Sequence, residues 1–403
     1  MHYIRAFFLT FLAVLAAACA VNWFVDPYGM YWSPVIDGVN AEKPASVSRV
    51  RVIKAYRAPQ VSPEILLVGN SRVEMGLSPL HPAFTGKSVY NLGLPGASVA
   101  MQLDYALNTV RQAGTVNRVI IGVDFLDFLY SPASLENWDH TGSQPGYTER
   151  LAAFTPGWQA RWFRLQEKAA LVFSLDSLFA SVESLFSQDG LNNSISPRGQ
   201  NAAGTYQAII ATEGIKPLFV QKIRELEARL GGKTHVLRKD ADALSPAFSA
   251  LAEFLDAMHE RDIKVDLFIN PYHFSYVMLL DNLGLADLFL EWKALLVDQN
   301  NDAHKEPVPL WDFSGFGQEV MEPLPRQEVG QAMTWFWEPA HYREQLGDKV
   351  IERIMAGDSD GFGVRMTEDG VSLLLKKNSR ELEVAANDWA NLKKRLKLSN
   401  PQK

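Results

Sequence analysis

The sequence predicts an α/β fold: a doubly wound sheet of five parallel strands with a helical insertion, preceded by one apolar helix. Three observations predict it. Short apolar runs that end in glycine, asparagine or aspartate recur along the chain, and amphipathic segments separate them. These runs are continuous rather than alternating, as in strands covered on both faces. An uncharged segment of about twenty residues, the length that spans a bilayer, lies near the N-terminus.

That N-terminal segment is "AFFLTFLAVLAAACAVNWFV", residues 6–25. Arg5 precedes it and Asp26 follows it, so the positive-inside rule places the N-terminus in the cytoplasm. We therefore expect a single-pass anchor in the inner (cytoplasmic) membrane, residues 1–25, with a periplasmic body. A cleaved signal peptide fits "LAAACA" only loosely, because the apolar run continues past the small residues. A lipid anchor on Cys19 lacks the usual branched residue before the cysteine.

Composition narrows the class of protein. The chain has 403 residues, 47% of them hydrophobic, which is enough for one large domain with insertions or for two domains. The formal net charge is -7, which argues against a nucleic-acid-binding surface. Cys19 is the only cysteine, so no intramolecular disulfide supports the fold.

The pattern after the anchor gives the domain organisation. Residues 26–63 contain several Pro, Gly and Ser breaks and predict an extended stalk. The predicted α/β domain covers residues 64–356, with an insertion at about 130–245 that is helical, aromatic and rich in loops and that caps one end of the sheet. Residues 357–403 predict a hairpin, turning at "EDG", and a charged helix.

Within the α/β domain, strands and helices alternate. Strands are predicted at 65–69, 87–93, 117–125, 263–270 and 308–313, and helices at 97–114, 246–261 and 285–298. The segment 333–355 becomes helical in its second half. In the insertion, residues 218–230 place their apolar side chains on one helical face, which indicates packing.

Polar residues follow the strands at one edge of this sheet, because the carboxyl ends of parallel strands meet there. In chain order they are Ser71, Asn91, Gly93, Asp124, Asn270, His273, Glu338 and His341.

Ser71 has two interpretations. It could cap a helix after the first strand, or it could be a nucleophile with a base and an orienting group nearby. Glu338 and His341 are three residues apart before a helix, a spacing at which the carboxylate can hold the imidazole while His341 reaches Ser71. Glu338 also suits the dipole of the helix that follows it.

"GNSR" after the first strand, "NLGLPGAS" after the second and an acidic-x-x-His element resemble the sequence blocks of the SGNH (GDSL-type) hydrolase superfamily. The resemblance is greatest to membrane-anchored members of cell-envelope acylation systems, such as alginate O-acetylation and teichoic-acid D-alanylation proteins. It implies a flavodoxin-like sheet, Ser71 as nucleophile, His341 as general base and Glu338 as orienting carboxylate. The N–H groups of Ser71 and Gly93 are then expected to stabilise the oxyanion.

One block departs from the family pattern. The third block is Gly-x-Asn-Asp in the family, with Asn as an oxyanion donor, whereas this chain has "GVDF" with Asp124. An ionised Asp124 repels an oxyanion. The site therefore lacks that donor, holds Asp124 protonated, or uses another group such as Asn270. Glutamate in place of the usual aspartate at Glu338 is a mild change.

The resemblance implies transfer of an acyl group, most often acetyl, to or from a hydroxyl of an envelope or exported polysaccharide. A membrane-bound O-acyltransferase is a candidate partner, and water as acceptor makes the same machinery an esterase. The alternative is a catalytically inactive protein of the same fold that binds glycan or scaffolds an envelope complex, and Asp124 favours it.

Several residues have weaker assignments. Arg72 binds an anionic substrate group or forms a structural ion pair. His273 and the pair Asp139-His140 are substrate contacts, an alternative base, or ordinary loop residues. Five tryptophans could stack on sugar rings or belong to the core: Trp138, Trp158, Trp162, Trp335 and Trp337. The sequence shows no metal-ligand spacing, no dinucleotide fingerprint and no P-loop, so we expect no metal and no cofactor.

Overall fold

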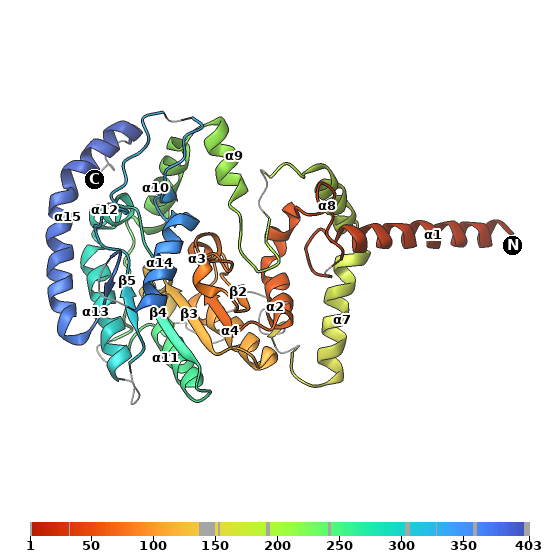
Figure 1. Ribbon diagram of the computed structural model, residues 1–403, viewed down its shortest axis with the longest axis horizontal. Coiled ribbons are helices and arrows are strands. Elements are labelled where there is room, and N and C mark those ends of the chain that lie inside the picture. Colours follow the sequence, from red (N-terminus) through yellow and green to blue (C-terminus); the bar gives the residue numbers. More distant parts are fainter. Residues whose placement is uncertain are drawn as a thin grey trace.

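A computed structural model describes residues 2–31, 33–136, 150–151, 154–190, 194–240, 243–302, 307–327, 329–357 and 361–398. Its centre is a six-stranded sheet in the order β2-β1-β3-β4-β5-β8 (Figure 1). The strands are β1 (Ile65–Val68), β2 (Val89–Asn91), β3 (Arg118–Val123), β4 (Lys264–Ile269), β5 (Leu310–Asp312) and β8 (Val364–Arg365). The first five are parallel, as predicted, whereas β8 pairs antiparallel with β5 and was not predicted.

The first three strands create the crevice in which the site lies. The chain passes from β1 through α3 (Ser71–Gly76) to β2 on one side, then through α4 (Val99–Ala113) to β3 on the other side of β1. Right-handed crossovers in opposite directions place these helices on opposite faces of the sheet. The connections after β1 and β3 therefore diverge and leave a crevice at their carboxyl ends.

Two helix layers cover the sheet. On the α4 side, α4 contacts α2 (Val50–Val61) and α11 (Pro246–His259), which contacts α13 (Ala286–Asp302). On the α3 side, α3 contacts α14 (Glu344–Ala356). At the edge farthest from the N-terminal helix (Figure 1), α15 (Glu368–Leu396) packs against α13 and α12 (Phe274–Asn282).

The C-terminal segment corrects one prediction. The "EDG" sequence was expected to turn a hairpin, but it begins α15 instead. The Thr367 side chain caps this helix by accepting from the Gly370 N–H, and Glu368 and Asp369 occupy the first turn. Acidic residues there are stabilised by the helix dipole, so the same residues suit a helix start as well as a turn.

The N-terminal region corrects a second prediction, that of an extended stalk. Helix α1 (His2–Val25) is long and apolar enough to span a membrane and projects from the body. Residues 26–63 do not form an extended stalk: they contain a 3-10 helix (Pro44–Arg49) and α2, which is packed against α4. A second small core joins Tyr28, Met30 and Tyr56 of this segment to Leu171 and Ala180 of the insertion. Ala55 and Ala58 of α2 belong to the main core. These contacts hold the segment on the body.

The insertion has two parts. Helices α7 (Trp158–Phe173) and α8 (Leu175–Phe186) pack against α1, and α5 (Pro132–Glu136) precedes them. Helices α9 (Gly204–Thr212) and α10 (Lys216–Leu230) come next, and α10 contacts the hairpin β6 (Phe336–Glu338) and β7 (His341–Tyr342). The predicted apolar face of α10 is buried, with its four members Phe219, Ile223, Leu226 and Leu230.

A buried ion pair ties α2 to the elements beside the crevice. The Nζ of Lys54 lies 2.9 Å from Oε1 of Glu74 on α3 and donates to the Gly93 carbonyl at 2.6 Å. Both side chains of the pair are buried. Burial lowers the pKa of Lys54 and the Glu74 carboxylate opposes that shift.

We expect Lys54→Met to lower the free energy of unfolding by about 3–5 kcal/mol, because it leaves the Glu74 carboxylate buried without its partner. Denaturant unfolding of the purified full chain in detergent measures this. The control is Lys87→Met, which removes a pair with Glu64 that is half-exposed at the surface, and should change stability little. Equal effects of the two substitutions would contradict the assignment of Lys54 as a structural tie.

Candidate active site

Ser71 is the first residue of α3, directly after the turn that ends β1. The helix is capped by Asn70, whose Oδ1 accepts from the Arg72 N–H at 3.0 Å. The capping role considered for Ser71 therefore belongs to its neighbour. Gly69 is required in this turn, since a Cβ there would lie 2.4 Å from Cγ2 of Val73. The hydroxyl of Ser71 is left to make another contact.

That contact is with His341. The Oγ of Ser71 lies 2.8 Å from Nε2 of His341, and Nδ1 of His341 is hydrogen-bonded to Oε1 of Glu338. Since a carboxylate only accepts, Nδ1 carries the proton and Nε2 is free to accept from the Ser71 hydroxyl. The structure thus brings together the three residues that the sequence selected, in the order of a nucleophile, base and orienting acid.

The β6–β7 hairpin sets the geometry of the acid and base. Glu338 and His341 pair across the two strands, linked by Pro339 and Ala340. The Ala340 N–H donates to Oε2 of Glu338 at 2.8 Å. One interpretation made Glu338 a charge partner of the helix that follows it. Because α14 begins only at Glu344, Glu338 does not have that role.

The environment of Glu338 favours its ionised form. Its side chain is 1% exposed. Burial by itself raises the pKa of Glu338, but the charge and hydrogen bond of His341, with the Ala340 N–H, outweigh burial and hold it below the ordinary value of 4.5. An ionised carboxylate at this place can stabilise the imidazolium that forms when His341 takes a proton.

Arg72 and Asp124 form a buried ion pair beside the crevice. Arg72 also donates from Nε to the Ala340 carbonyl at 2.8 Å, and its guanidinium lies 5.1 Å from the centre of the Tyr272 ring. Asp124 further accepts from the Leu126 N–H and the Tyr272 hydroxyl. Of the two interpretations of Arg72, the structure supports the structural ion pair. The Asp124 carboxylate serves this pair.

Asn91 and Gly93, two residues expected near the oxyanion, instead hold the backbone. The Gly93 N–H donates to Oδ1 of Asn91 at 2.9 Å, and the Asn91 amide donates to the carbonyls of Val73 and Leu77, both at 2.8 Å. These contacts bind the loop after β2 to α3. The expectation that the Gly93 N–H faces an oxyanion is therefore wrong in this structure.

Asn270 is likewise occupied. Its amide donates to the Val123 carbonyl at 2.9 Å, and its Oδ1 accepts from the Tyr342 hydroxyl at 3.1 Å. Its side chain is fully buried. It therefore links β3, β4 and β7 and does not replace the missing asparagine donor.

The backbone N–H of Ser71 has no hydrogen-bond partner among the described residues. The Leu94 N–H donates to the Gly69 carbonyl at 2.8 Å and so fixes the loop after β2 on the turn that precedes Ser71. Of the oxyanion donors expected from the sequence, the Ser71 N–H is the one left open by these contacts.

His273 is a structural residue. It is fully buried and caps α12, its Nδ1 accepts from Ser275, and its Nε2 donates to the Glu322 carbonyl at 2.8 Å. Burial lowers the pKa of His273 to about 4, which keeps it neutral. It is therefore neither a substrate contact nor an alternative base. Trp138 and the pair Asp139-His140 lie outside the described residues.

The insertion contributes an aromatic side chain that the sequence did not single out. The Tyr206 ring on α9 lies 6.0 Å from the His341 ring and 6.0 Å from that of Trp337. Only the tertiary fold brings it here. Tyr206 and Glu338 line a pocket of about 210 Å³, and Trp337 and Met75 line another of about 330 Å³; Ser71 lines neither.

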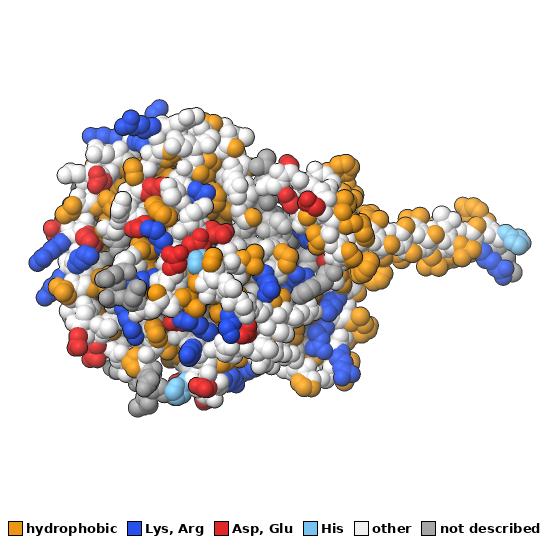
Figure 2. Space-filling model, in the orientation of Figure 1, with side chains coloured by type: hydrophobic (Ala, Val, Ile, Leu, Met, Phe, Trp, Pro, Cys, Tyr) orange, Lys and Arg blue, Asp and Glu red, His pale blue; other side chains and the backbone are white. Residues whose placement is uncertain are grey.

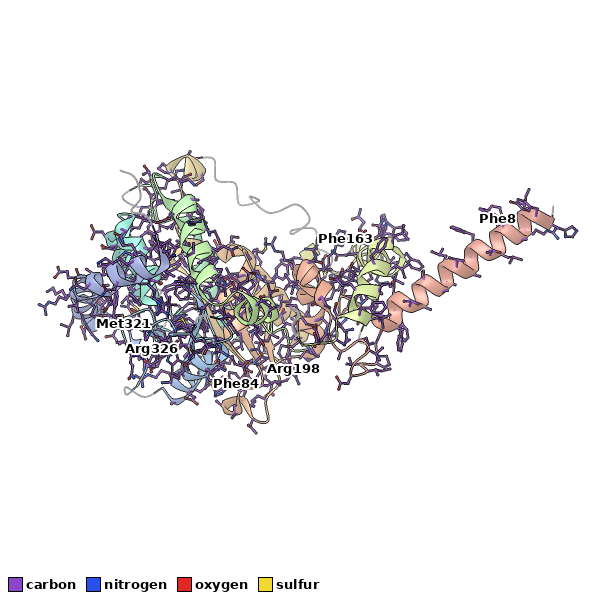
Figure 3. All side chains as sticks on the ribbon, turned by 90° about the horizontal axis from the view of Figure 1, so that it is seen from above. Phe8, Phe84, Phe163, Arg198, Met321 and Arg326 are labelled. Carbon is purple, nitrogen blue, oxygen red and sulfur yellow. The ribbon has the colours of Figure 1, made fainter. Side chains whose placement is uncertain are left out.

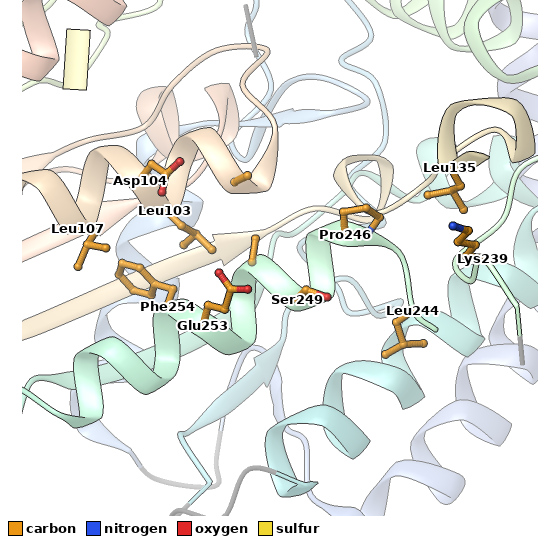
Figure 4. Close-up of a pocket in the computed structure, with 12 residues that line it drawn as sticks. Leu103, Asp104, Leu107, Leu135, Lys239, Leu244, Pro246, Ser249, Glu253 and Phe254 are labelled. Atoms are coloured by element: carbon orange, nitrogen blue, oxygen red, sulfur yellow. The ribbon is translucent and has the colours of Figure 1, made fainter. Parts of the chain in front are cut away.

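The other tryptophans and pockets lie elsewhere or have other partners. Trp335 is covered by Lys349 and Trp337 by Arg343, while Trp158 and Trp162 lie on α7. A pocket of about 380 Å³ between α4 and α11 (Figure 4) is lined by residues such as Leu103 and Phe254, and none of the three catalytic candidates reaches it.

No protein-family model matches the chain, and no curated protein matches it. The functional assignment therefore rests on the geometry above and on the sequence blocks.

A carboxylate next to the Asn70 cap gives a pH-dependent prediction. Asp127 accepts from the side chains of Asn70 and Gln102, both at 3.1 Å. Burial and the nearby charge of Asp124 raise the pKa of Asp127 to about 7, against the opposing effect of Arg72. Between its ordinary pKa of 3.8 and about 7, this carboxyl keeps its proton in the folded chain and loses it in the unfolded chain. The free energy of unfolding therefore falls as the pH rises through this range.

We therefore expect Asp127→Asn to stabilise the fold relative to the wild type by about 1–3 kcal/mol at pH 8, and to lose most of that advantage at pH 4. Denaturant unfolding at the two pH values measures it. Asp388→Asn, at an exposed position on α15, is the control and should show no such trend. An advantage independent of pH would show that Asp127 is charged throughout.

Proposed function

We propose that the chain is an extracytoplasmic serine acyltransferase or esterase with Ser71 as nucleophile, His341 as general base and Glu338 as orienting carboxylate. The observation that carries the proposal is the 2.8 Å contact between Ser71 and His341, with the buried Glu338 behind the imidazole. Residues 270 positions apart converge on an arrangement that activates a hydroxyl.

The proposed reaction follows from the positions of the protons. His341 takes the proton of the Ser71 hydroxyl as Oγ attacks the carbonyl carbon of an ester, and the oxyanion forms near the open N–H group of Ser71. His341 then gives the proton to the departing alcohol. The acyl-Ser71 ester passes to a second hydroxyl in a transferase or to water in an esterase, with His341 again as base.

The substrate class comes from the sequence resemblance. The order of the five parallel strands, 2-1-3-4-5, is the flavodoxin-like order that the SGNH resemblance implies, which supports membership of that superfamily. With α1 as a cytoplasmic-membrane anchor and the body in the periplasm, the substrates are O-acetyl groups on an envelope or exported polysaccharide. A membrane-bound O-acyltransferase would supply the acyl group.

A second candidate is an inactive protein of the same fold that binds glycan or scaffolds an envelope complex. One specific observation favours it: Gly93, Asn270 and Asp124 are all occupied in structural contacts. The oxyanion is left with fewer donors than the sequence blocks led us to expect.

A serine-directed fluorophosphonate probe separates the two candidates. We expect the purified full chain to be labelled and Ser71→Ala to lose the labelling, because the probe reacts with a serine activated by a base. His341→Gln should slow labelling by about 10²–10⁴-fold. Ser249→Ala, at an exposed serine of α11, is the matched control and should label normally. Absence of labelling in the wild type would favour the scaffold.

A further inference from the structure

Helix α8 has its apolar residues on the wrong side for a helix in water. Four large apolar side chains recur at spacings of four, three and four and are 72, 74, 45 and 87% exposed: Leu175, Phe179, Val182 and Phe186. The opposite face, which is buried, carries Ser177, Ala180, Ser181 and Ser184. A helix of a water-soluble body buries its apolar face and exposes the polar one. The medium that suits the outward face of α8 is therefore apolar.

The inward face of this helix is fixed to α1. Asn22 lies within the apolar helix and is only 2% exposed. Its amide donates to the Val172 carbonyl at 2.7 Å, and its Oδ1 accepts from the Ser181 hydroxyl at 2.9 Å. Inside a bilayer a polar group needs an internal partner, and small residues let two helices approach closely enough to supply it. The bent helix pair α7–α8 supplies both to α1.

The depth of this contact follows from the length of α1. The uncharged run 6–25 rises about 30 Å as a helix, which equals the thickness of the hydrocarbon core. Asn22 comes three residues before the end of that run. Helix α8 is thus level with the last turn of the apolar run, at the boundary between hydrocarbon and headgroups, if α1 spans the bilayer.

The arrangement of the two helices agrees with such a boundary. Helix α7 extends sideways from the base of α1, at a steep angle to it (Figure 1), and apolar side chains at that base continue those along α1 (Figure 2). In the view from above, Phe163 of α7 lies on the side of the body, whereas Phe8 lies towards the far end of α1 (Figure 3). Trp158 and Trp162 of α7 are 76% and 55% exposed. Tryptophans are favoured at this depth, and the exposed Arg161 can meet anionic headgroups.

We propose that α8 and the adjoining turn of α7 lie in the half of the bilayer nearest the folded body, beside α1, with lipid against their exposed apolar face. The chain then holds the membrane by an anchor and by an amphipathic helix that lies in the plane of the membrane. The second contact fixes the tilt of the catalytic crevice above the membrane surface. This inference rests on the membrane-anchor part of the proposed function and does not depend on catalysis.

Spin labels on the full chain test the proposal. In a Cys19→Ser background, single cysteines replace Phe179 and Phe186, with Leu373→Cys on α15 as control because Leu373 is 74% exposed, as Phe179 is. Leu12→Cys reports whether α1 is inserted. The chain is reconstituted in vesicles of phosphatidylethanolamine and phosphatidylglycerol. Collision of each label with oxygen, which concentrates in lipid, is compared with that of a water-soluble nickel chelate.

We expect labels at 12, 179 and 186 to favour oxygen over the chelate several-fold more than the label at 373. If position 12 reports lipid while 179 and 186 match 373, the proposal for α8 is overturned and the anchor stands. If position 12 also reports water, both are overturned. Dipolar broadening at 179 that disappears on dilution with unlabelled chain would show a second copy on this face and would also overturn the proposal. Fluorophosphonate labelling of Ser71 remains a separate measurement in each case.

Discussion

The site depends on how closely α3 and the β7–α14 segment approach each other. A Cβ on Gly347 of α14 would lie 1.7 Å from the carbonyl oxygen of Gly76, and a Cβ on Gly76 would lie 2.0 Å from the Tyr342 ring. No larger residue fits at either position without moving one backbone from the other. Ser71 begins α3 and His341 precedes Tyr342, so this approach sets the distance between the proposed nucleophile and its proposed base.

Two buried ion pairs hold α3 in that position. Arg72 pairs with Asp124 at the end of β3, and Glu74 pairs with Lys54 of α2. Taking four charges out of water is costly, and each pair recovers that cost only while its partners remain in register. Arg72 and Glu74 follow Ser71 by one and three residues in the chain. Charge pairing thus fixes the orientation of the short helix, whose six residues would not be stable alone.

Much of this architecture could be predicted from the sequence, because it follows from patterns that recur locally. Continuous apolar runs identified the five parallel strands, and the position after the first of them identified Ser71. The acidic-x-x-His spacing identified Glu338 and His341, although the two-stranded β6–β7 sheet that holds them was not predicted. The side-chain orientation of the polar residues could not be predicted. Asn91 and Asn270 stand at the expected edge, yet both amides turn to backbone carbonyls. A motif specifies residue type and place, whereas the partner depends on which buried carbonyls would otherwise lack a donor.

Other differences between the predicted and the observed structure also depend on which partners the fold provides. Asn70 and Ser71 are both good capping residues, and only the structure shows that Asn70 takes the cap. Residues 26–63 contain breaks typical of a linker, but their apolar side chains pack against the insertion and the main core. Tyr206 reaches His341 from an insertion that no local pattern connects with the site.

The central claim is that Ser71 becomes covalently acylated. The most direct measurement is mass spectrometry of the full chain, quenched in acid within milliseconds of mixing with an activated acetyl ester and then digested. The account predicts one acetyl group, on the peptide that contains Ser71, absent from Ser71→Ala and strongly reduced in His341→Gln. A wild-type chain with no acetyl group on Ser71, or with the same acetylation in Ser71→Ala, would contradict it.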